Sequence, residues 1–118
     1  MIRFISAFVL LVIASSARAQ TLNLAQSYDL LQTDTDSSAV GTATIKSLSD
    51  TTFAIEWNVD GEVTKGFGMR FNDVLACSYT YGGKPGLVAY KIGDNSLDGV
   101  FATQGISGTG TERLTPKK

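Results

Sequence analysis

The chain has 118 residues with a formal net charge of −1 at pH 7, and 43% of its residues are hydrophobic, which is enough for the core of one small domain. Its few basic residues are scattered, which argues against nucleic acid as a partner because counterion release requires several clustered cations. The sequence contains no histidine, and this excludes serine-histidine and cysteine-histidine catalysis and most zinc sites.

The amino-terminal segment, residues 1–19, is typical of a cleaved signal peptide. Residues 4–14 form a nearly unbroken apolar run, which is shorter than the ~20 residues that a membrane-spanning helix needs. Small residues, Ala17 and Ala19, occupy the two positions that signal peptidase reads. We therefore expect cleavage after Ala19, leaving residues 20–118 as a single domain in the periplasm or outside the cell, with no stable membrane anchor.

The next segment, residues 22–31, carries an ambiguous pattern. Leu24, Tyr28 and Leu31 would line one face of a helix, but residues 28–32 could equally form the first strand. If residues 28–32 are counted as a strand, the chain has eight strands in all.

The polar loop at residues 33–38 has carboxylates at alternate positions, Asp34 and Asp36, as a calcium-binding loop does. The match ends there. Ala39 occupies the sixth position, where a calcium loop requires glycine, and Ile45 the twelfth, where it requires a glutamate. We interpret the segment as an ordinary turn, and we predict no metal site and no cofactor.

The clearest pattern in the chain is a β-hairpin at residues 51–71. Before Asp60-Gly61, apolar side chains recur at every second position, which places them on one face of a strand. These side chains are Phe53, Ile55, Trp57 and Val59. After Asp60-Gly61 the alternation resumes with Val63, Phe67 and Met69, which predicts the second strand of the hairpin.

Two registers fit this hairpin. A two-residue turn at Asp60-Gly61 places Trp57 beside Thr64 and splits the two apolar faces. A three-residue loop at residues 59–61 pairs Trp57 with Val63, so that one face stays apolar throughout. The three-residue loop also suits a type I turn that ends with glycine in the left-handed conformation, and it is the register that we prefer.

Turn signals divide the chain into short extended segments with no room for a crossover helix. We expect eight strands, at residues 28–32, 40–48, 51–58, 62–70, 74–81, 86–92, 97–103 and 109–115. Consecutive strands this close must be antiparallel neighbours, and closure into a barrel removes their unpaired edges. The predicted fold is therefore all-β, an antiparallel up-and-down meander that closes into a small barrel.

Large side chains on the apolar face predict a mostly solid barrel, because an eight-stranded barrel holds only its own side chains or one small ligand. The candidates are Phe53, Trp57, Phe67, Met69, Leu75, Tyr79 and Tyr90. Glycines within strands, Gly66, Gly68 and Gly99, indicate sharp coiling or the close approach of another backbone. Cys77 is the only cysteine, so it cannot form an internal disulfide, and we expect a small buried hydrophobe.

Turn glycines and core aromatics recur in short motifs through nearly the whole of residues 20–118. They are Tyr28, Gly41-Thr42-Ala43-Thr44-Ile45, Trp57-Asn58-Val59-Asp60-Gly61, Gly66-Phe67-Gly68, Asp73-Val74-Leu75-Ala76, Gly86-Leu87-Val88-Ala89-Tyr90, Leu97-Asp98-Gly99-Val100-Phe101 and Gly110-Thr111-Glu112-Arg113-Leu114-Thr115-Pro116. Together they resemble a group of small exported bacterial β-proteins, whose members are often labelled fibronectin-binding or uncharacterised. The resemblance implies binding to an extracellular or envelope protein and brings no catalytic residue. In outline the barrel is also similar to avidin and lipocalin barrels, an analogy of fold alone.

Two patterns with catalytic associations have simpler explanations. Glu56, Asp60 and Glu62 lie near one another in the hairpin, but they fall on its outer face or in its turn and are interpreted as solvated charge. Residues 105–110 resemble a phosphate loop only in glycine content, because no helix follows them. We therefore predict a protein that is not an enzyme.

Two functional classes remain. The first is an exported interaction protein of the cell envelope or exterior. In the alternative, a partly open barrel mouth takes a small apolar ligand, and the candidate lining residues are Trp57, Tyr79, Tyr81 and Tyr90. Core packing is the expected role of each of these rings, and an internal void of roughly several hundred Å³ would favour ligand binding.

Overall fold

The computed structural model describes residues 22–34 and 37–118. The expected signal peptide, residues 1–19, and its cleavage site lie outside these ranges, as does Asp36 of the polar loop. The part of the chain that is described has no helix long and apolar enough to cross a membrane.

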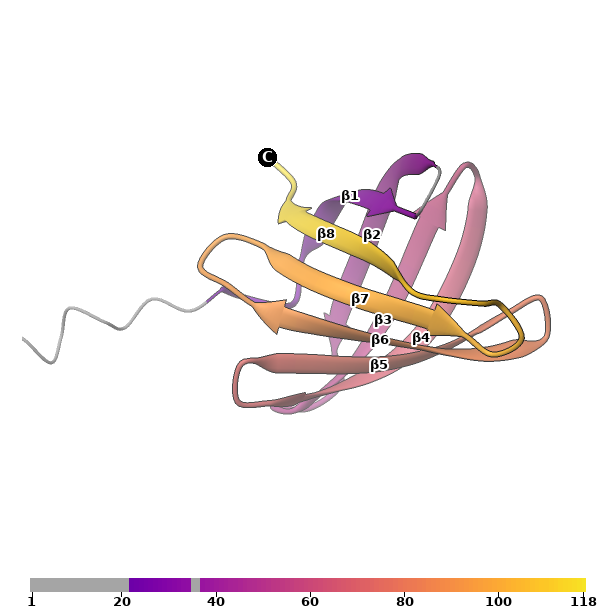
Figure 1. Ribbon diagram of the computed structural model, residues 1–118. Helices are drawn as coiled ribbons and strands as arrows, with labels where there is room; N and C mark the ends of the chain where they lie inside the picture. Colours follow the sequence, from indigo (N-terminus) through magenta and orange to yellow (C-terminus); the bar gives the residue numbers. More distant parts are fainter. Residues whose placement is uncertain (1–21, 35–36) are drawn as a thin grey trace, which may run out of the picture.

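Eight strands form one closed barrel (Figure 1). They are β1 (Ser27–Thr33), β2 (Ser38–Ser47), β3 (Thr52–Val59), β4 (Glu62–Phe71), β5 (Val74–Tyr81), β6 (Lys84–Ile92), β7 (Leu97–Thr103) and β8 (Gly110–Pro116). Each strand pairs in antiparallel fashion with the next along the chain, and β8 pairs with β1 to complete the barrel. The predicted all-β meander is thus confirmed, and the ambiguous segment contributes a strand.

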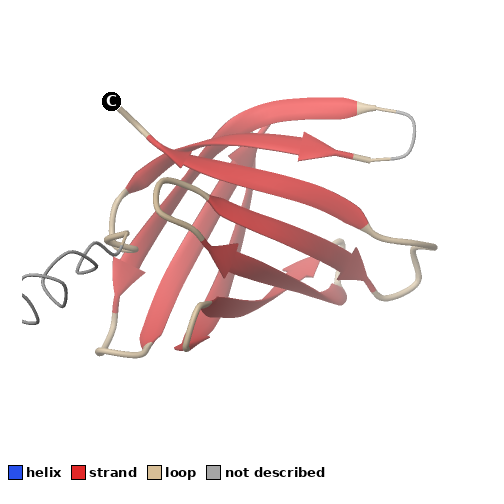
Figure 2. Ribbon diagram, turned by 60° about the vertical axis from the view of Figure 1, so that its left-hand side comes forward, coloured by secondary structure: helices blue, strands red, loops and turns tan. Residues whose placement is uncertain are grey.

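The two ends of the barrel differ, and Figure 2 shows loops at both. At the end where β1 begins, Leu22 and Leu24 are buried against the core. The hydroxyl of Tyr28 donates a hydrogen bond of 2.9 Å to the carbonyl oxygen of Leu24. We call this the closed end. At the opposite end, which we call the mouth, lie the loops that follow β1, β3, β5 and β7.

The hairpin of β3 and β4 differs from the predicted register. Val59 pairs with Glu62 and Trp57 with Thr64, so the connection is the two-residue turn Asp60-Gly61. Both turn residues have positive φ, 54° at Asp60 and 79° at Gly61. These values are typical of a type I′ turn, whose twist matches that of the paired strands. The prediction of a three-residue loop was wrong.

This register turns the apolar side of β4 outward. Phe67 and Met69, which were predicted in the core, are 53% and 57% exposed, and Val63 is exposed with them. Inside the barrel β4 presents small residues instead. A Cβ atom at Gly66 would lie 2.7 Å from Cζ3 of Trp57, so this indole already fills the space beside β4. The close packing of the interior leaves no room for the large side chains that the other register would place there.

At four places around the barrel, an aromatic ring fills the space beside a glycine, which has no side chain of its own. Four rings each lie against a glycine of the neighbouring strand, in the pairs Trp57 and Gly66, Tyr79 and Gly86, Tyr90 and Gly99, and Phe101 and Gly110. A Cβ atom at any of these glycines would collide with the ring. The expected close approach of another backbone occurs at Gly66, where the carbonyl oxygen of Ser78 also crowds the position. The glycines therefore make space for the rings of adjacent strands.

The buried core runs from the closed end toward the mouth. It consists of Leu22, Leu24, Tyr28, Leu30, Ala43, Ile45, Phe53, Ile55, Trp57, Leu75, Cys77, Val88, Tyr90, Leu97 and Leu114. Cys77 is buried as a free thiol among these side chains, as predicted. Trp57 and Val88 mark where the packed core ends and a hollow begins.

Candidate functional site

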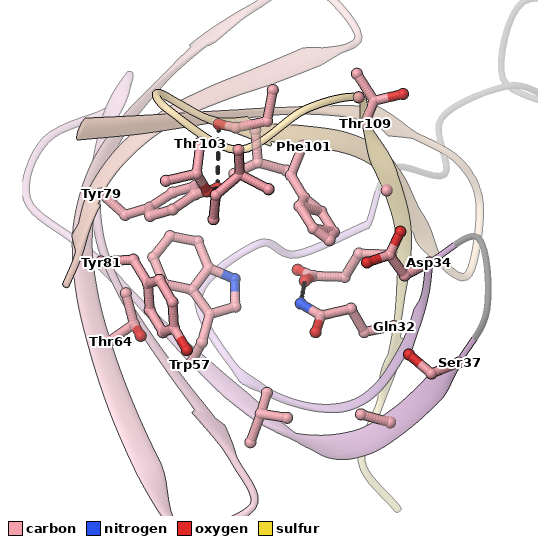
Figure 3. A pocket seen from close by; sticks show the side chains of 18 of the residues that line it. Gln32, Asp34, Ser37, Trp57, Thr64, Tyr79, Tyr81, Phe101, Thr103 and Thr109 are labelled. Carbon is pink, nitrogen blue, oxygen red and sulfur yellow. Dashed lines mark hydrogen bonds between the residues drawn. The ribbon is translucent and has the colours of Figure 1, made fainter. Parts of the chain in front are cut away.

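A cavity of about 350 Å³ lies inside the mouth of the barrel (Figure 3). All eight strands contribute to its wall, and residues 106–109 of the loop after β7 border it as well. The barrel is therefore filled toward the closed end and hollow toward the mouth. The prediction of a mostly solid interior holds only for the closed half.

Aromatic side chains form one side of the cavity. Figure 3 shows Trp57, Tyr79 and Tyr81 together there, with Phe101 nearby. The rings of Trp57 and Tyr79 meet edge to face, with centroids 5.8 Å apart and planes at 69°, an arrangement that aromatic pairs favour. The hydroxyl of Tyr79 lies 2.8 Å from Oγ1 of Thr103. These contacts fix the positions of the rings on this side of the cavity.

A chain of hydrogen bonds runs beneath and across the cavity. Nε1 of Trp57 donates to the hydroxyl of Tyr90 at 2.8 Å, and this hydroxyl donates to Oε2 of Glu112. Nε2 of Gln32 donates to Oε1 of Glu112 at 3.2 Å. Gln32 lies across the cavity from Trp57 in Figure 3. Four strands, β3, β6, β8 and β1, thus contribute one residue each to a network centred on a carboxyl group.

The carboxyl group of Glu112 is buried although it lines the cavity. Glu112 is 6% exposed, and burial raises the pKa of its carboxyl above the usual value. The hydrogen bonds from Tyr90 and Gln32 oppose part of this rise. Within residues 22–34 and 37–118, no ion pair includes Glu112. Each carboxyl oxygen accepts one hydrogen bond from a neutral side chain and can accept another.

Two other titratable groups adjoin Glu112, and both remain protonated near neutral pH. Burial raises the pKa of Tyr90 well above its usual value, and the charge of Glu112 adds to this rise. Burial also raises the pKa of the Cys77 thiol to about 12, again with a contribution from Glu112. Tyr90 therefore acts as a hydrogen-bond donor, and Cys77 is an inert core residue.

The structure brings together three of the four rings singled out from the sequence. Trp57, Tyr79 and Tyr81 line the cavity, whereas Tyr90 is fully buried and does not. Its hydroxyl instead connects the indole of Trp57 to the carboxyl of Glu112. Tyr90 thus anchors the cavity wall from within the core.

Two polar residues of the cavity, Glu112 and Gln32, were missed by sequence reasoning. Glu112 stands between Gly110 and Leu114 at alternate positions of β8, so the period of two places it on the inward face. Gln32 holds the corresponding place after Leu30 in β1. A charged residue at an inward position of a short strand was the signal that could have identified the site.

The acidic residues of the hairpin of β3 and β4 are all exposed. Glu56 is exposed, and Oε2 of its carboxylate lies 3.8 Å from Nζ of Lys65. Asp60 and Glu62 are exposed at the rim of the mouth. Among the described residues, no group of three or more cysteine, aspartate or glutamate side chains is placed to hold a metal ion.

Comparison with solved structures places the fold among small β-barrels. The chain is similar to a protein described as the de novo design of a fluorescence-activating β-barrel, with a TM-score of 0.60 and 14% sequence identity. The similarity covers 78% of this chain and 92% of the designed chain, and at this identity it shows the fold alone. No protein-family model and no curated protein matches the chain. Fold and cavity together define a small antiparallel β-barrel with a hollow mouth.

Proposed function

We propose that this protein is an exported, non-enzymatic binding protein that takes a small molecule into the mouth of its barrel. The observation that carries the proposal is the cavity of about 350 Å³, with aromatic rings on one side and the buried carboxyl of Glu112 in its wall. Its volume lies within the roughly 300–1,000 Å³ that is typical of ligand sites. Aromatic side chains beside a few precisely placed polar groups are also typical of such sites, and this wall combines Trp57 and Tyr79 with Gln32 and Glu112.

The cavity is preformed, which favours binding. The ring contact between Trp57 and Tyr79 and the hydrogen bonds of Tyr79 and Glu112 fix the wall in advance. A ligand therefore orders few side chains when it enters, and the entropic cost of binding falls.

The test uses N-phenyl-1-naphthylamine, an uncharged aromatic dye whose emission rises in apolar surroundings. We expect the dye to bind the wild-type protein saturably at one site per chain. Thr64→Phe should abolish binding, because Thr64 is half-buried in the cavity wall and pairs with Trp57, so a ring there fills the hollow.

The matched control is Val63→Phe, which places the same ring on the exposed outer side of the same strand. This variant should bind the dye as the wild-type protein does. Equal binding to the Thr64→Phe variant would show that the dye binds elsewhere. The absence of saturable binding to the wild-type protein would count against a ligand-binding barrel.

Export is part of the proposal and rests on the signal-peptide pattern of residues 1–19. We expect protein recovered from the cell envelope or the medium to begin at Gln20. Intact-mass analysis would reveal this start, whereas a mass that includes Met1 would contradict export by cleavage.

Binding to an extracellular protein is the second candidate function, and the outer surface of β4 and its neighbours favours it. Phe67, Met69 and Phe71 are exposed along one side of β4. Val74 lies opposite Phe71 on β5, and exposed Leu87 on β6 is in register with Phe67, with Ser78 of β5 between them. We call these five residues the outer apolar face. Adjoining exposed apolar side chains are typical of protein-protein interfaces.

Because the sequence motifs resemble a group labelled fibronectin-binding, purified fibronectin is the partner to test against the outer apolar face. The double variant Phe67→Ser and Phe71→Ser should lose binding to immobilised fibronectin and keep its binding of the naphthylamine dye. Unchanged fibronectin binding by this variant, or none by the wild-type protein, would refute this role.

A further inference from the structure

The wall of the cavity carries acidic side chains and, among the described residues that line it, no lysine or arginine. Glu112 lies inside, and Asp34, Asp60 and Glu62 lie toward the rim. Lys84 at the start of β6 lies against Gly105 in the loop after β7, outside this lining. The formal charge of the lining residues is therefore negative, which favours cations over anions.

The deepest of these acids lacks a charged partner. Glu112 is buried, and the side chains that donate hydrogen bonds to it, including Tyr90 and Gln32, are neutral. Removing a carboxylate from water is unfavourable unless an opposite charge compensates, and neutral hydrogen bonds compensate only in part. A cation inside the cavity would provide the missing charge, and both carboxyl oxygens can still accept a hydrogen bond from it.

The aromatic side of the cavity suits the same ligand. Trp57, Tyr79, Tyr81 and Phe101 line the cavity that also contains Glu112. Aromatic faces attract ammonium groups through their quadrupole, and they also bury an apolar carbon skeleton. A bare metal ion fits less well, because the described residues place no group of three cysteine, aspartate or glutamate ligands together.

We infer that the cavity takes a small organic cation, whose ammonium group lies against the carboxylate of Glu112 and whose apolar body packs among Trp57, Tyr79 and Phe101. The inference rests on the proposed function and specifies the chemical class of its ligand. The ammonium group donates hydrogen bonds to the free acceptor positions of Glu112. The hydrogen bonds from Tyr90 and Gln32 hold the carboxylate in place.

The test compares three ligands of similar shape that differ in charge, namely 2-phenylethylammonium, 2-phenylethanol and 3-phenylpropionate. Their Kd values are measured on the wild-type protein at pH 7 by competition with the naphthylamine dye and by calorimetry. We expect the ammonium compound to bind about tenfold more tightly than the alcohol, and the carboxylate to bind most weakly. A preference of less than about threefold for the ammonium compound over the alcohol, or tighter binding of the carboxylate, would overturn the inference.

Glu112→Gln tests whether the charge of Glu112 causes the preference for the ammonium compound, because the substitution removes the charge and keeps the size of the side chain. The preference for ammonium over alcohol should fall to within about twofold in this variant. Glu56→Gln removes an exposed charge that lies outside the cavity lining and serves as the matched control, in which the preference should persist. A preference that survives Glu112→Gln would overturn the inference. If Glu112→Gln does not fold, the three-ligand comparison on the wild-type protein still decides.

The dye separates this inference from the function on which it rests. If the dye binds the wild-type protein but the three ligands do not differ, the organic-cation inference fails and the ligand-binding function stands. If neither the dye nor any of the three ligands binds, the proposed function itself fails.

Discussion

The ring of Tyr90 occupies the space that a side chain at Gly99 would need. The two residues pair directly between β6 and β7, and a Cβ atom at Gly99 would lie 2.6 Å from Cδ1 of the ring. The ring cannot move away easily, because its hydroxyl accepts a hydrogen bond from Trp57 and donates one to Glu112. Because Gly99 has no side chain, the ring of Tyr90 fits beside it. The Tyr90 hydroxyl then connects Trp57 to Glu112, both of which line the cavity.

Gly99→Ala should therefore destabilise the fold. We expect the free energy of unfolding to fall by about 1–3 kcal/mol, the usual cost of adding a methyl group to a packed interior. Guanidinium denaturation followed by far-UV circular dichroism measures this loss. Val100→Ala, at the adjacent exposed position of β7, is the control and should cost less than about 1 kcal/mol. Equal losses in the two variants would show that Tyr90 yields to the added methyl group.

Trp57→Ala removes the ring that borders both the core and the cavity. Trp57 is buried, packs against Gly66 and contacts the ring of Tyr79. We expect a loss of about 3–5 kcal/mol in the free energy of unfolding. Trp57→Phe keeps a ring and should lose less. A loss below about 1 kcal/mol for Trp57→Ala would contradict the burial of this side chain.

The raised pKa of Glu112 predicts how stability depends on pH. A carboxyl whose pKa is higher in the folded than in the unfolded state contributes stability below its unfolded pKa, near 4.5, and this contribution is lost as pH rises through the folded pKa. Wild-type protein should therefore gain stability relative to Glu112→Gln as pH falls from neutral toward 4.5. Urea denaturation of both proteins across this range measures the difference.

The neighbours of Glu112 do not contribute to the dependence of stability on pH in this range. Tyr90 and Cys77 have pKa values raised too far to titrate between pH 4.5 and neutral, and Trp57 and Gln32 do not titrate there. A stability difference between wild-type protein and Glu112→Gln that does not change with pH would show that the folded carboxyl titrates at its usual pKa.

Cys77 should be unreactive in the folded protein. A pKa of about 12 leaves roughly one thiol in ten thousand ionised at pH 8, and the thiolate is the reactive form. Folded protein should therefore resist alkylation by iodoacetamide, and unfolded protein should react at the rate of a free thiol. Mass spectrometry after timed exposure measures both rates. Rapid alkylation of the folded protein would show that the thiol is accessible.

Much of the fold was predictable, because alternation and turn residues are local signals. Residues 74–81 and 97–103 were predicted as strands with the bounds that β5 and β7 have. The register of β3 and β4 was not predictable in this way. The apolar alternation of β4 suggested that its large side chains face inward. The ring of Trp57 already fills the space beside β4, however, so the side of the strand that carries Gly66 faces inward instead.

The site was less predictable than the fold. Trp57, Tyr79 and Tyr81 could be named as candidates, but their meeting at one cavity depends on the closure of the barrel. Glu112 was overlooked because its strand is short and only three inward positions define its face. The hollow itself is enclosed by residues from all eight strands, which no single segment reveals. Export and the resemblance to fibronectin-binding proteins remain predictions.

Energy transfer from Trp57 to bound dye tests the hollow mouth most directly, because Trp57 is the only tryptophan in the chain and lines the cavity. We predict that N-phenyl-1-naphthylamine quenches tryptophan emission saturably at one dye per chain, and that Thr64→Phe abolishes the effect while Val63→Phe leaves it unchanged. Tryptophan emission that stays constant as the dye is added, or quenching that persists in Thr64→Phe, would contradict a ligand site inside the barrel.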